Sequence, residues 1–156
     1  MDRQPFESAD GARHGEPHNA WRLIAGATGY RPLSEAEWEY ACRAGTQTEF
    51  SIGNDETLLT SYCQMRPAKR TSLCGEKMPN GWGLHDMHGN VYELCENLYD
   101  VTFVNRICRG GSWDDGTESC RAAHRVPQQP SARTMAIGFR LALSPSVHTP
   151  LEVQDR

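Results

Sequence analysis

The chain has 156 residues, the length of one ordinary domain, and can bury about two-thirds of its unfolded surface around a single core. Its 14 glycines and 9 prolines favour a turn-rich globular fold over a helical bundle. The net charge of -4 comes from interspersed acids and bases, and the absence of a basic run excludes nucleic acid as the expected partner. No segment approaches the roughly 20 apolar residues that span a bilayer. We therefore expect a soluble chain without direct membrane insertion or a visible signal peptide, and its compartment stays open.

The first predicted elements are an arm and a helix. Residues 1–18 are polar and lack periodicity, which is typical of a poorly specified N-terminal arm. Asn19 can cap a short amphipathic helix that ends at Gly29. The apolar positions of that helix are Trp21, Leu23, Ile24 and Ala27.

A second helix is predicted after Ser34. Glu37 stands three residues on and completes a capping box, and Gly45 ends the element. The apolar positions between these signals are Trp38, Tyr40, Ala41 and Cys42.

The middle of the chain predicts loops with short strands. From Thr46 to Gly81 neither helical nor alternating periodicity persists. A short strand near Leu84 and a tight turn at Gly89 follow, after which residues 91–94 return to the core.

Two strands are predicted in the last third of the chain. The β-branched residues between Val101 and Arg109 fit the first of them. Phe139, Leu141 and Leu143 alternate with other residues, the period of a half-buried strand, and residues 144–156 form a C-terminal tail.

Four segments in order resemble the formylglycine-generating enzyme (sulfatase-modifying factor) family. They are YRPLSEAEWEYACRAGT (30–46), NGWGLHDMHGNVYELCENLY (80–99), RICRGGSW (106–113) and GFRLA (138–142). The resemblance implies an α+β domain with the family's irregular C-type lectin-like fold and little regular secondary structure. We place this domain at residues 19–143, as either the C-terminal portion of a longer domain of this kind or a shortened member of the family.

The resemblance also implies a copper-dependent oxidation, for which one of the two cysteine ligands is missing here. Active family members use oxygen and two copper-binding cysteines after a Gly-Gly-Ser-aromatic turn to convert a substrate cysteine to formylglycine. In GGSWDDGTESCRAAHR, Asp114 and Asp115 stand near the place of the first cysteine, and only Cys120 remains. One thiolate would have to hold Cu(I) where two are required, so copper is not expected.

Ser112 and Arg125 match family active-site positions, which makes them, with Cys120, the candidate catalytic residues. A structural role is the better interpretation of both. A serine after two glycines can hold a turn, and an arginine can tie loops together through several donors.

The resemblance implies a calcium site in the turn DMHGNVYE. The family's ligands, one side chain, two backbone carbonyls and a glutamate, map onto Asp86, Gly89, Val91 and Glu93. Calcium takes about 6 to 8 oxygen ligands, so two carboxylates with turn carbonyls and waters form a plausible cage. In the alternative, Asp86 caps the turn and Glu93 pairs with an arginine. We favour a structural ion, because two acids converging on a buried turn repel each other without a cation.

Cysteine usage leaves the redox compartment open. The six cysteines do not by themselves establish a disulfide scaffold. Cys42, Cys95 and Cys120 fit small buried apolar groups. Cys63 and Cys74, close together in a loop, are the most plausible disulfide.

The first functional hypothesis is a non-catalytic binding or structural module. Its loops around residues 113–120 and 126–136 would face a protein or small-molecule partner. The family's fold also occurs in variable ligand-binding proteins, whose diversified segment has the frame seen here from Gly110 to Leu141. A subunit of a larger assembly is a related hypothesis. The alternative is a copper-dependent formylglycine-type oxidase with other ligands, such as Cys108 with Cys120 or His124.

Overall fold

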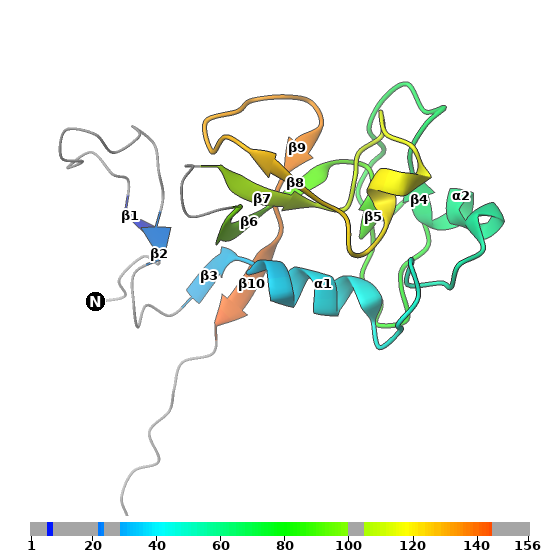
Figure 1. Cartoon of the computed structure of the whole chain (residues 1–156), viewed down its shortest axis with the longest axis horizontal. Coiled ribbons are helices and arrows are strands. Elements are labelled where there is room, and N and C mark those ends of the chain that lie inside the picture. Colours follow the sequence, from blue (N-terminus) through cyan, green and yellow to red (C-terminus); the bar gives the residue numbers. More distant parts are fainter. Residues whose placement is uncertain (1–5, 8–21, 24–28, 100–104, 145–156) are drawn as a thin grey trace, which may run out of the picture.

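A computed structural model describes residues 6–7, 22–23, 29–99 and 105–144. Its largest sheet has four strands in the order β8, β7, β6, β9. These strands are β6 (Tyr92–Leu98), β7 (Arg106–Arg109), β8 (Arg125–Gln128) and β9 (Ile137–Gly138). β9 runs parallel to β6 and the other pairs are antiparallel. Helix α1 (Glu35–Arg43) packs against β6 and β7 (Figure 1).

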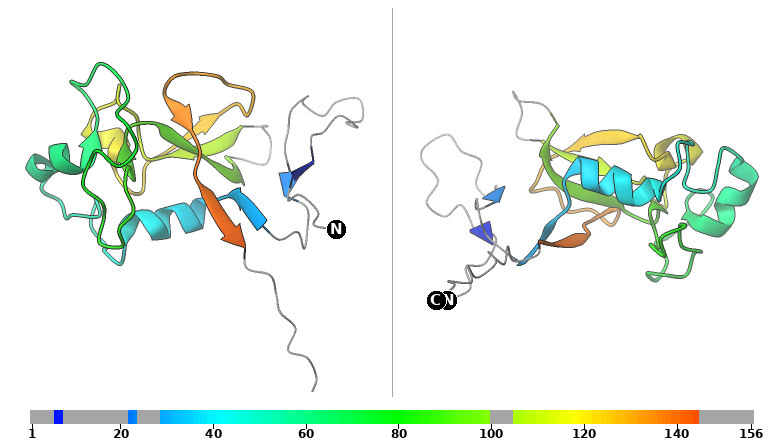
Figure 2. Two further views of the ribbon diagram at one scale, coloured as in Figure 1. Left: turned by 180° about the vertical axis from the view of Figure 1, so that it is seen from behind. Right: turned by 90° about the horizontal axis from the view of Figure 1, so that it is seen from below.

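Small two-stranded pairings complete the described fold. β3 (Gly29–Pro32) pairs antiparallel with β10 (Leu141–Ser144), which joins the two ends of the domain (Figure 2). β4 (Cys63–Gln64) pairs parallel with β5 (His88–Gly89). The described residues therefore form an irregular α+β fold, as predicted.

Helix α1 confirms the prediction made from its capping box. The Ser34 hydroxyl accepts from the Glu37 backbone N–H at 3.3 Å, and the Glu37 carboxylate accepts from the Ser34 N–H at 2.8 Å. Arg31 hydrogen-bonds the same carboxylate and, with Ser34, lowers the pKa of Glu37 to about 2. Ala44 adopts the left-handed conformation and Gly45 follows with φ 90°, which ends the helix.

Two apolar clusters form the core. The first lies between α1 and the sheet around Trp38, and the second lies beneath the loops around Phe50. The buried members of the first are Leu33, Trp38, Cys42, Met87, Cys95, Ile107 and Ala122. Those of the second are Phe50, Leu59, Cys63 and Cys120.

The N-terminal helix predicted from Asn19 is wrong at the two residues of it that can be checked before Gly29. Arg22–Leu23 form strand β2, which pairs with β1 (Phe6–Glu7). Apolar residues at 21 and 23 fit the alternation of a strand as well as the spacing of a helix, and pairing with β1 decides between them. Gly29 begins β3 rather than ending a helix. The rest of this segment, most of the arm and the tail after Ser144 lie outside the described residues.

The region from Thr46 to Gly81, predicted as loops with short strands, also contains two short helices that the sequence did not predict. A 3-10 helix η1 (Glu56–Leu58) is capped by Asp55 and continues into α2 (Leu59–Tyr62). Each has only a few residues, too few for an apolar period to show in the sequence.

The strand predicted near Leu84 is also wrong. The Leu84 N–H donates to the Asn80 side chain at 3.0 Å, and its carbonyl accepts from the Asn80 backbone at 2.9 Å, so both groups serve a turn. The strand comes later, at His88–Gly89. The strand predicted at 101–109 is present as β7, and residues 100–104 lie outside the described part.

The strand predicted from Phe139 to Leu143 begins only at Leu141, as β10, and its apolar residues are not buried. Phe139, Leu141 and Leu143 are 67%, 49% and 61% exposed. Arg140 lies before β10, and its guanidinium reaches the Glu93 carboxylate. Among the described residues, no helix is both long enough and apolar enough to cross a bilayer.

Replacing the helix cap tests how α1 is held. We expect Ser34→Ala to lower the free energy of unfolding by about 1 kcal/mol, because the hydroxyl no longer accepts the Glu37 N–H. Urea denaturation measures this change. Ser131→Ala, in an exposed turn, is the control and should stay within about 0.5 kcal/mol of the wild type. Equal effects of the two substitutions would contradict the role of the cap.

Candidate functional site

A buried carboxylate, Glu93, stands at the centre of the candidate site. The Trp38 indole N–H donates to Oε2 at 2.7 Å. The Arg140 guanidinium donates to Oε2 at 2.9 Å and to Oε1 at 2.7 Å, a two-pronged ion pair. Glu93 therefore joins α1, β6 and the segment between β9 and β10. The alternative to the calcium site predicted that Glu93 pairs with an arginine, and this pairing is present.

Arg140 also fixes the turn that precedes β5. Its guanidinium donates to the His85 carbonyl at 2.8 Å. Burial opposes its charge, but the hydrogen bond and attraction of Glu93 outweigh burial and raise the pKa of Arg140 above its usual value. A positive charge therefore lies beside Glu93 and the turn within the protein itself.

An open pocket of about 730 Å³ lies beside this ion pair. Asp86 lines it with a left-handed backbone, φ 58°, and its Oδ2 accepts the Gly75 N–H at 2.8 Å. Asp86 Oδ1 is buried and has no hydrogen-bond partner. The pocket is lined by Cys74, Gly75, Gly83, Leu84, His85, Asp86, Asn90, Val91, Glu93, Gly138, Phe139 and Arg140.

Three of the four predicted calcium ligands, Asp86, Val91 and Glu93, line this pocket. The fourth, Gly89, has φ 82° and lies so close to β4 that an added Cβ would be 2.4 Å from the Gln64 carbonyl oxygen. Within the described ranges, no three His, Cys, Asp or Glu side chains form a group that could hold a metal. A cation here would rest on the two carboxylates and backbone oxygens, and its presence stays a prediction.

Two carboxylate oxygens of this turn keep acceptor capacity that a calcium ion would use. Asp86 Oδ1 is a free acceptor, and Glu93 Oε1 receives one donor although a carboxylate oxygen offers two acceptor positions. However, Arg140 already balances the charge of Glu93, which removes part of the reason for expecting the ion.

The Gly-Gly-Ser-Trp turn is held by its own side chains. The Ser112 hydroxyl and backbone N–H both donate to Asp115 Oδ2, and Ser112 is buried. Gly111 has φ 76°, and a Cβ added there would lie 2.8 Å from the Cys120 sulfur. Asp115 thus acts as an acceptor that holds the turn.

Cys120 lies beneath this turn, fully buried in the second apolar cluster. Its backbone carbonyl accepts from His88 Nδ1 at 2.8 Å. His88 Nε2 accepts the Ser51 backbone N–H at 3.1 Å, so the ring is the neutral Nδ1–H tautomer. Burial lowers the pKa of His88 despite the hydrogen bond to Cys120, which favours this neutral form. Neither Cys120 nor Ser112 lines the pocket beside Glu93.

Arg125, the third candidate catalytic residue, binds surface groups. Its guanidinium lies 3.0 Å from the Glu35 carboxylate and 4.9 Å from the centroid of the Tyr99 ring. Ser112, Cys120 and Arg125 therefore each contact a different set of partners, and the structure does not bring the three together in one place.

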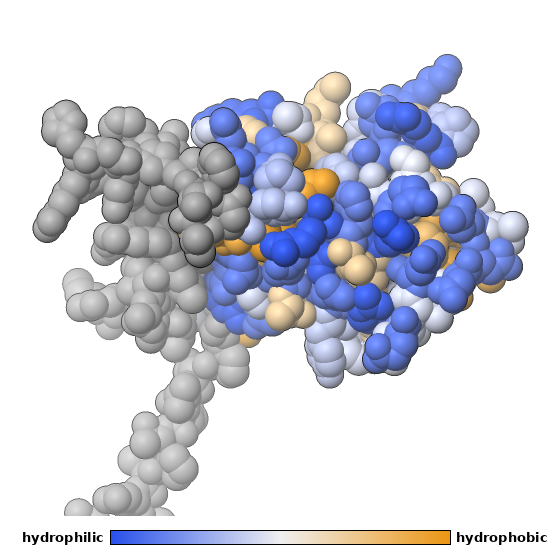
Figure 3. Space-filling view, in the orientation of Figure 1, coloured by the Kyte–Doolittle hydropathy of each residue, from blue (hydrophilic) through white to orange (hydrophobic). Residues whose placement is uncertain are grey.

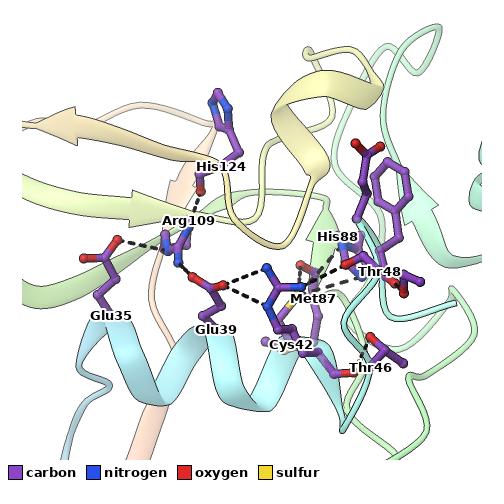
Figure 4. Close-up of polar contacts among 12 residues, drawn as sticks. Glu35, Glu39, Cys42, Thr46, Thr48, Met87, His88, Arg109 and His124 are labelled. Carbon is purple, nitrogen blue, oxygen red and sulfur yellow. Dashed lines mark hydrogen bonds and ion pairs between the residues drawn. The ribbon is translucent and has the colours of Figure 1, made fainter. Parts of the chain in front are cut away.

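The sequence did not predict the buried Arg109. Its guanidinium donates to Glu39 and to the His124 carbonyl, the latter at 2.7 Å, and its Nε lies 3.4 Å from Glu35 (Figure 4). It also lies over the Trp38 ring at 5.5 Å from the centroid. The available signal was the pair Glu35 and Glu39, four apart on one helix face, because two carboxylates so placed favour a nearby cation.

The comparisons with known proteins agree with this architecture. Residues 9–145 match the family described as Sulfatase-modifying factor enzyme 1-like domain. The chain is 31% identical over 156 residues to the formylglycine-generating enzyme of Mycobacterium tuberculosis, covering 75% of this chain and 52% of that enzyme. It is 33% identical over 141 residues to the serine/threonine-protein kinase pkn1 of Chlamydia pneumoniae, covering 75% of this chain and 22% of the kinase.

Among solved structures, Treponema denticola variable protein 1 matches with a TM-score of 0.74 and 32% identity, over 80% of this chain and 51% of that one. The fold is thus the α+β, C-type lectin-like fold of the formylglycine-generating enzymes. This chain belongs to the sulfatase-modifying factor family. It spans about half the length of the M. tuberculosis enzyme and less than a quarter of the kinase.

Removing the charge of Glu93 tests the centre of the site. We expect Glu93→Gln to lower the free energy of unfolding by about 3 kcal/mol, because it leaves the guanidinium of Arg140 without its carboxylate. Thermal and urea unfolding measure the loss. The matched control is Glu76→Gln, in an exposed loop, which should change stability by less than about 0.5 kcal/mol. A near-neutral Glu93→Gln would show that the ion pair does not hold the fold.

Proposed function

We propose that this domain is a non-catalytic binding or structural module on the formylglycine-generating enzyme scaffold. The burial of Cys120 beneath Gly111 carries the proposal. A thiolate that binds copper for the oxidation of a substrate by oxygen must be reachable by that substrate, and a sulfur packed in the cluster of Phe50 and Leu59 is not.

The surroundings of the turn support the same proposal. Asp115 binds Ser112 in the region where active members carry their first cysteine, and the exposed Asp114 lies 3.4 Å from Arg66. Cys108, an alternative copper ligand, is on β7 in register with Val126, whereas Cys120 belongs to the cluster around Phe50. These contacts favour a scaffold that is retained without its copper chemistry over a copper site built from Cys108 and Cys120.

The proposed binding surface is formed by β8 and the loop that follows it. β8 is an edge strand of the four-stranded sheet, and the exposed residues of the loop include Ser131, Arg133 and Met135, the last 80% exposed. The face seen in Figure 3 is mostly hydrophilic, with small apolar areas between the polar ones. The similarity to a protein named a variable protein supports a role for these loops in recognition.

We also propose a protein partner or a larger assembly. Tyr30 on β3 and Leu141 and Leu143 on β10 are large apolar side chains that face solvent across the same two-stranded pair. Apolar side chains gathered in this way are typical of a contact surface. The longer chains of the relatives fit such an arrangement.

Calcium in the Asp86–Glu93 turn is a further part of the proposal. The unpartnered Asp86 Oδ1 supports it, and the ion would brace the turn without supplying redox chemistry. Its contribution would add to that of the Glu93–Arg140 ion pair, which holds the turn in any case.

An activity assay tests the non-catalytic assignment. Wild-type protein is loaded with Cu(I) and incubated with oxygen and a cysteine-containing sulfatase peptide. We expect no conversion to formylglycine, because one buried thiol cannot hold copper as a thiolate pair does. Mass spectrometry of the peptide measures the product. Conversion by the wild type that is lost in Cys120→Ser, and kept in Cys74→Ser, would establish the oxidase instead.

A calcium titration tests the metal proposal. We expect saturating calcium to raise the melting temperature relative to chelator, by an amount equivalent to about 2.7 kcal/mol at 100 times Kd. Asp86→Asn should lose the response, because it weakens the free oxygen donor. Asp114→Asn, at an exposed site, should keep it. A wild-type melting temperature that ignores calcium would refute the site.

A further inference from the structure

Two cysteines that lie far apart in the sequence meet in the second apolar cluster. Cys63 begins β4 and Cys120 ends the 3-10 helix η2 (Thr117–Cys120). Both are buried, with 2% and 0% of their surface exposed, and both pack with Phe50 and Leu59. They are free thiols in this structure.

Three contacts connect the segments that carry the two cysteines. Cys63 is the register partner of His88 in the β4–β5 pair, and the His88 ring donates to the Cys120 carbonyl at 2.8 Å. The next residue, Gly89, donates its N–H to the Gly110 carbonyl at 2.6 Å. The segment that carries Cys63 is therefore attached through β5 to the turn that covers Cys120.

The sulfur atoms occupy the space beneath two glycines of this framework. A Cβ added at Gly89 would lie 2.6 Å from the Cys63 sulfur, and one added at Gly111 would lie 2.8 Å from the Cys120 sulfur. Both side chains belong to the same buried cluster. A bond between them requires that the two sulfurs approach each other within this cluster.

We propose that Cys63 and Cys120 form a disulfide by exchange with a small-molecule disulfide such as oxidised glutathione. One protein thiolate attacks the external disulfide, forms a mixed disulfide and releases one small thiol. The second protein thiolate attacks the mixed disulfide at the protein sulfur and releases the second small thiol. Two electrons pass from the protein to the external disulfide, and the two protons of the protein thiols end on the two released thiols.

The burial of the pair determines when this exchange takes place. The neighbouring Cys120 thiol and burial together raise the pKa of Cys63 far above its usual value, so the reactive thiolate is scarce in the closed fold. The bond therefore forms during folding or when η2 opens. Once formed, it is shielded from reductants by the same packing.

Cys74 is a less favourable partner for Cys63 than the loop spacing suggested. Cys74 is exposed and lines the pocket beside Asp86, whereas Cys63 is buried in the cluster that contains Cys120. The bond proposed here instead ties the 46–64 region to the loop after the Gly-Gly-Ser-Trp turn. Because it closes a long loop, it restricts the unfolded chain strongly.

Peptide mapping of the wild-type protein tests the pairing. The chain is refolded in mixtures of reduced and oxidised glutathione containing EDTA, quenched in acid, alkylated and digested with trypsin. Trypsin does not cleave between Arg66 and Pro67, so Cys63 lies in peptide 44–69, Cys120 in 110–121 and Cys74 in 71–77. We expect a disulfide that links 44–69 to 110–121, with 71–77 alkylated or carrying glutathione. A link from 44–69 to 71–77 would overturn the proposal, as would alkylation of both Cys63 and Cys120 in the most oxidising mixture.

Variants separate the pair from general thiol oxidation. Cys74→Ser should keep the link, and Cys63→Ser and Cys120→Ser should each abolish it and leave the other cysteine of the pair open to alkylation or glutathione. The oxidised wild type should unfold at a higher urea concentration than the reduced protein, and oxidation should not raise the midpoint of Cys63→Ser. An unchanged wild-type midpoint despite the mapped link would refute the stabilising role. If the serine variants do not fold, the map of the wild type still decides the pairing.

Discussion

The carboxylate of Glu93 is the constraint around which this domain is organised. A charge taken from water into a core is costly unless donors surround it, and here an indole and a guanidinium do so. These donors come from α1 and from the segment between β9 and β10, which the sequence separates widely. A fold with so little regular structure obtains its order from such long-range polar contacts as much as from its two apolar clusters. Arg109 is likewise a buried charge with polar partners: it pairs with Glu39 on α1 and lies over the ring of Trp38.

Features encoded locally could be predicted from the sequence. The capping box at Ser34 and Glu37 specifies the start of α1 without reference to any other element. Short strands are different, because a pair such as Cys63–Gln64 with His88–Gly89 exists only once the loops have folded. Two residues carry no period of their own. The same reason explains why Arg22–Leu23 form a strand within a segment whose apolar spacing predicts a helix.

The candidate site was predictable in its members and less so in their roles. Glu93 and Asp86 stood in a motif, and the arginine partner of Glu93 had been an alternative to an ion. That Arg140 supplies it depends on a chain path which only the structure gives. The neutral tautomer of His88 and the meeting of Cys63 with Cys120 likewise follow from packing between distant segments. The residue types indicate which roles are possible, and the packing of neighbouring segments determines which role each residue has.

The close packing of Gly111 over the sulfur of Cys120 divides the surface into two parts with different freedom to change. A side chain at this glycine would have to displace a buried sulfur and a backbone carbonyl at once, so the inner turn cannot vary without disturbing the core. Residues 129–135, in contrast, mostly face solvent at the sheet edge. New binding specificities could therefore arise by substitution in the loop of residues 129–135. The Gly-Gly-Ser-Trp turn would stay unchanged and keep the core packed, so the two parts of this small domain could evolve separately.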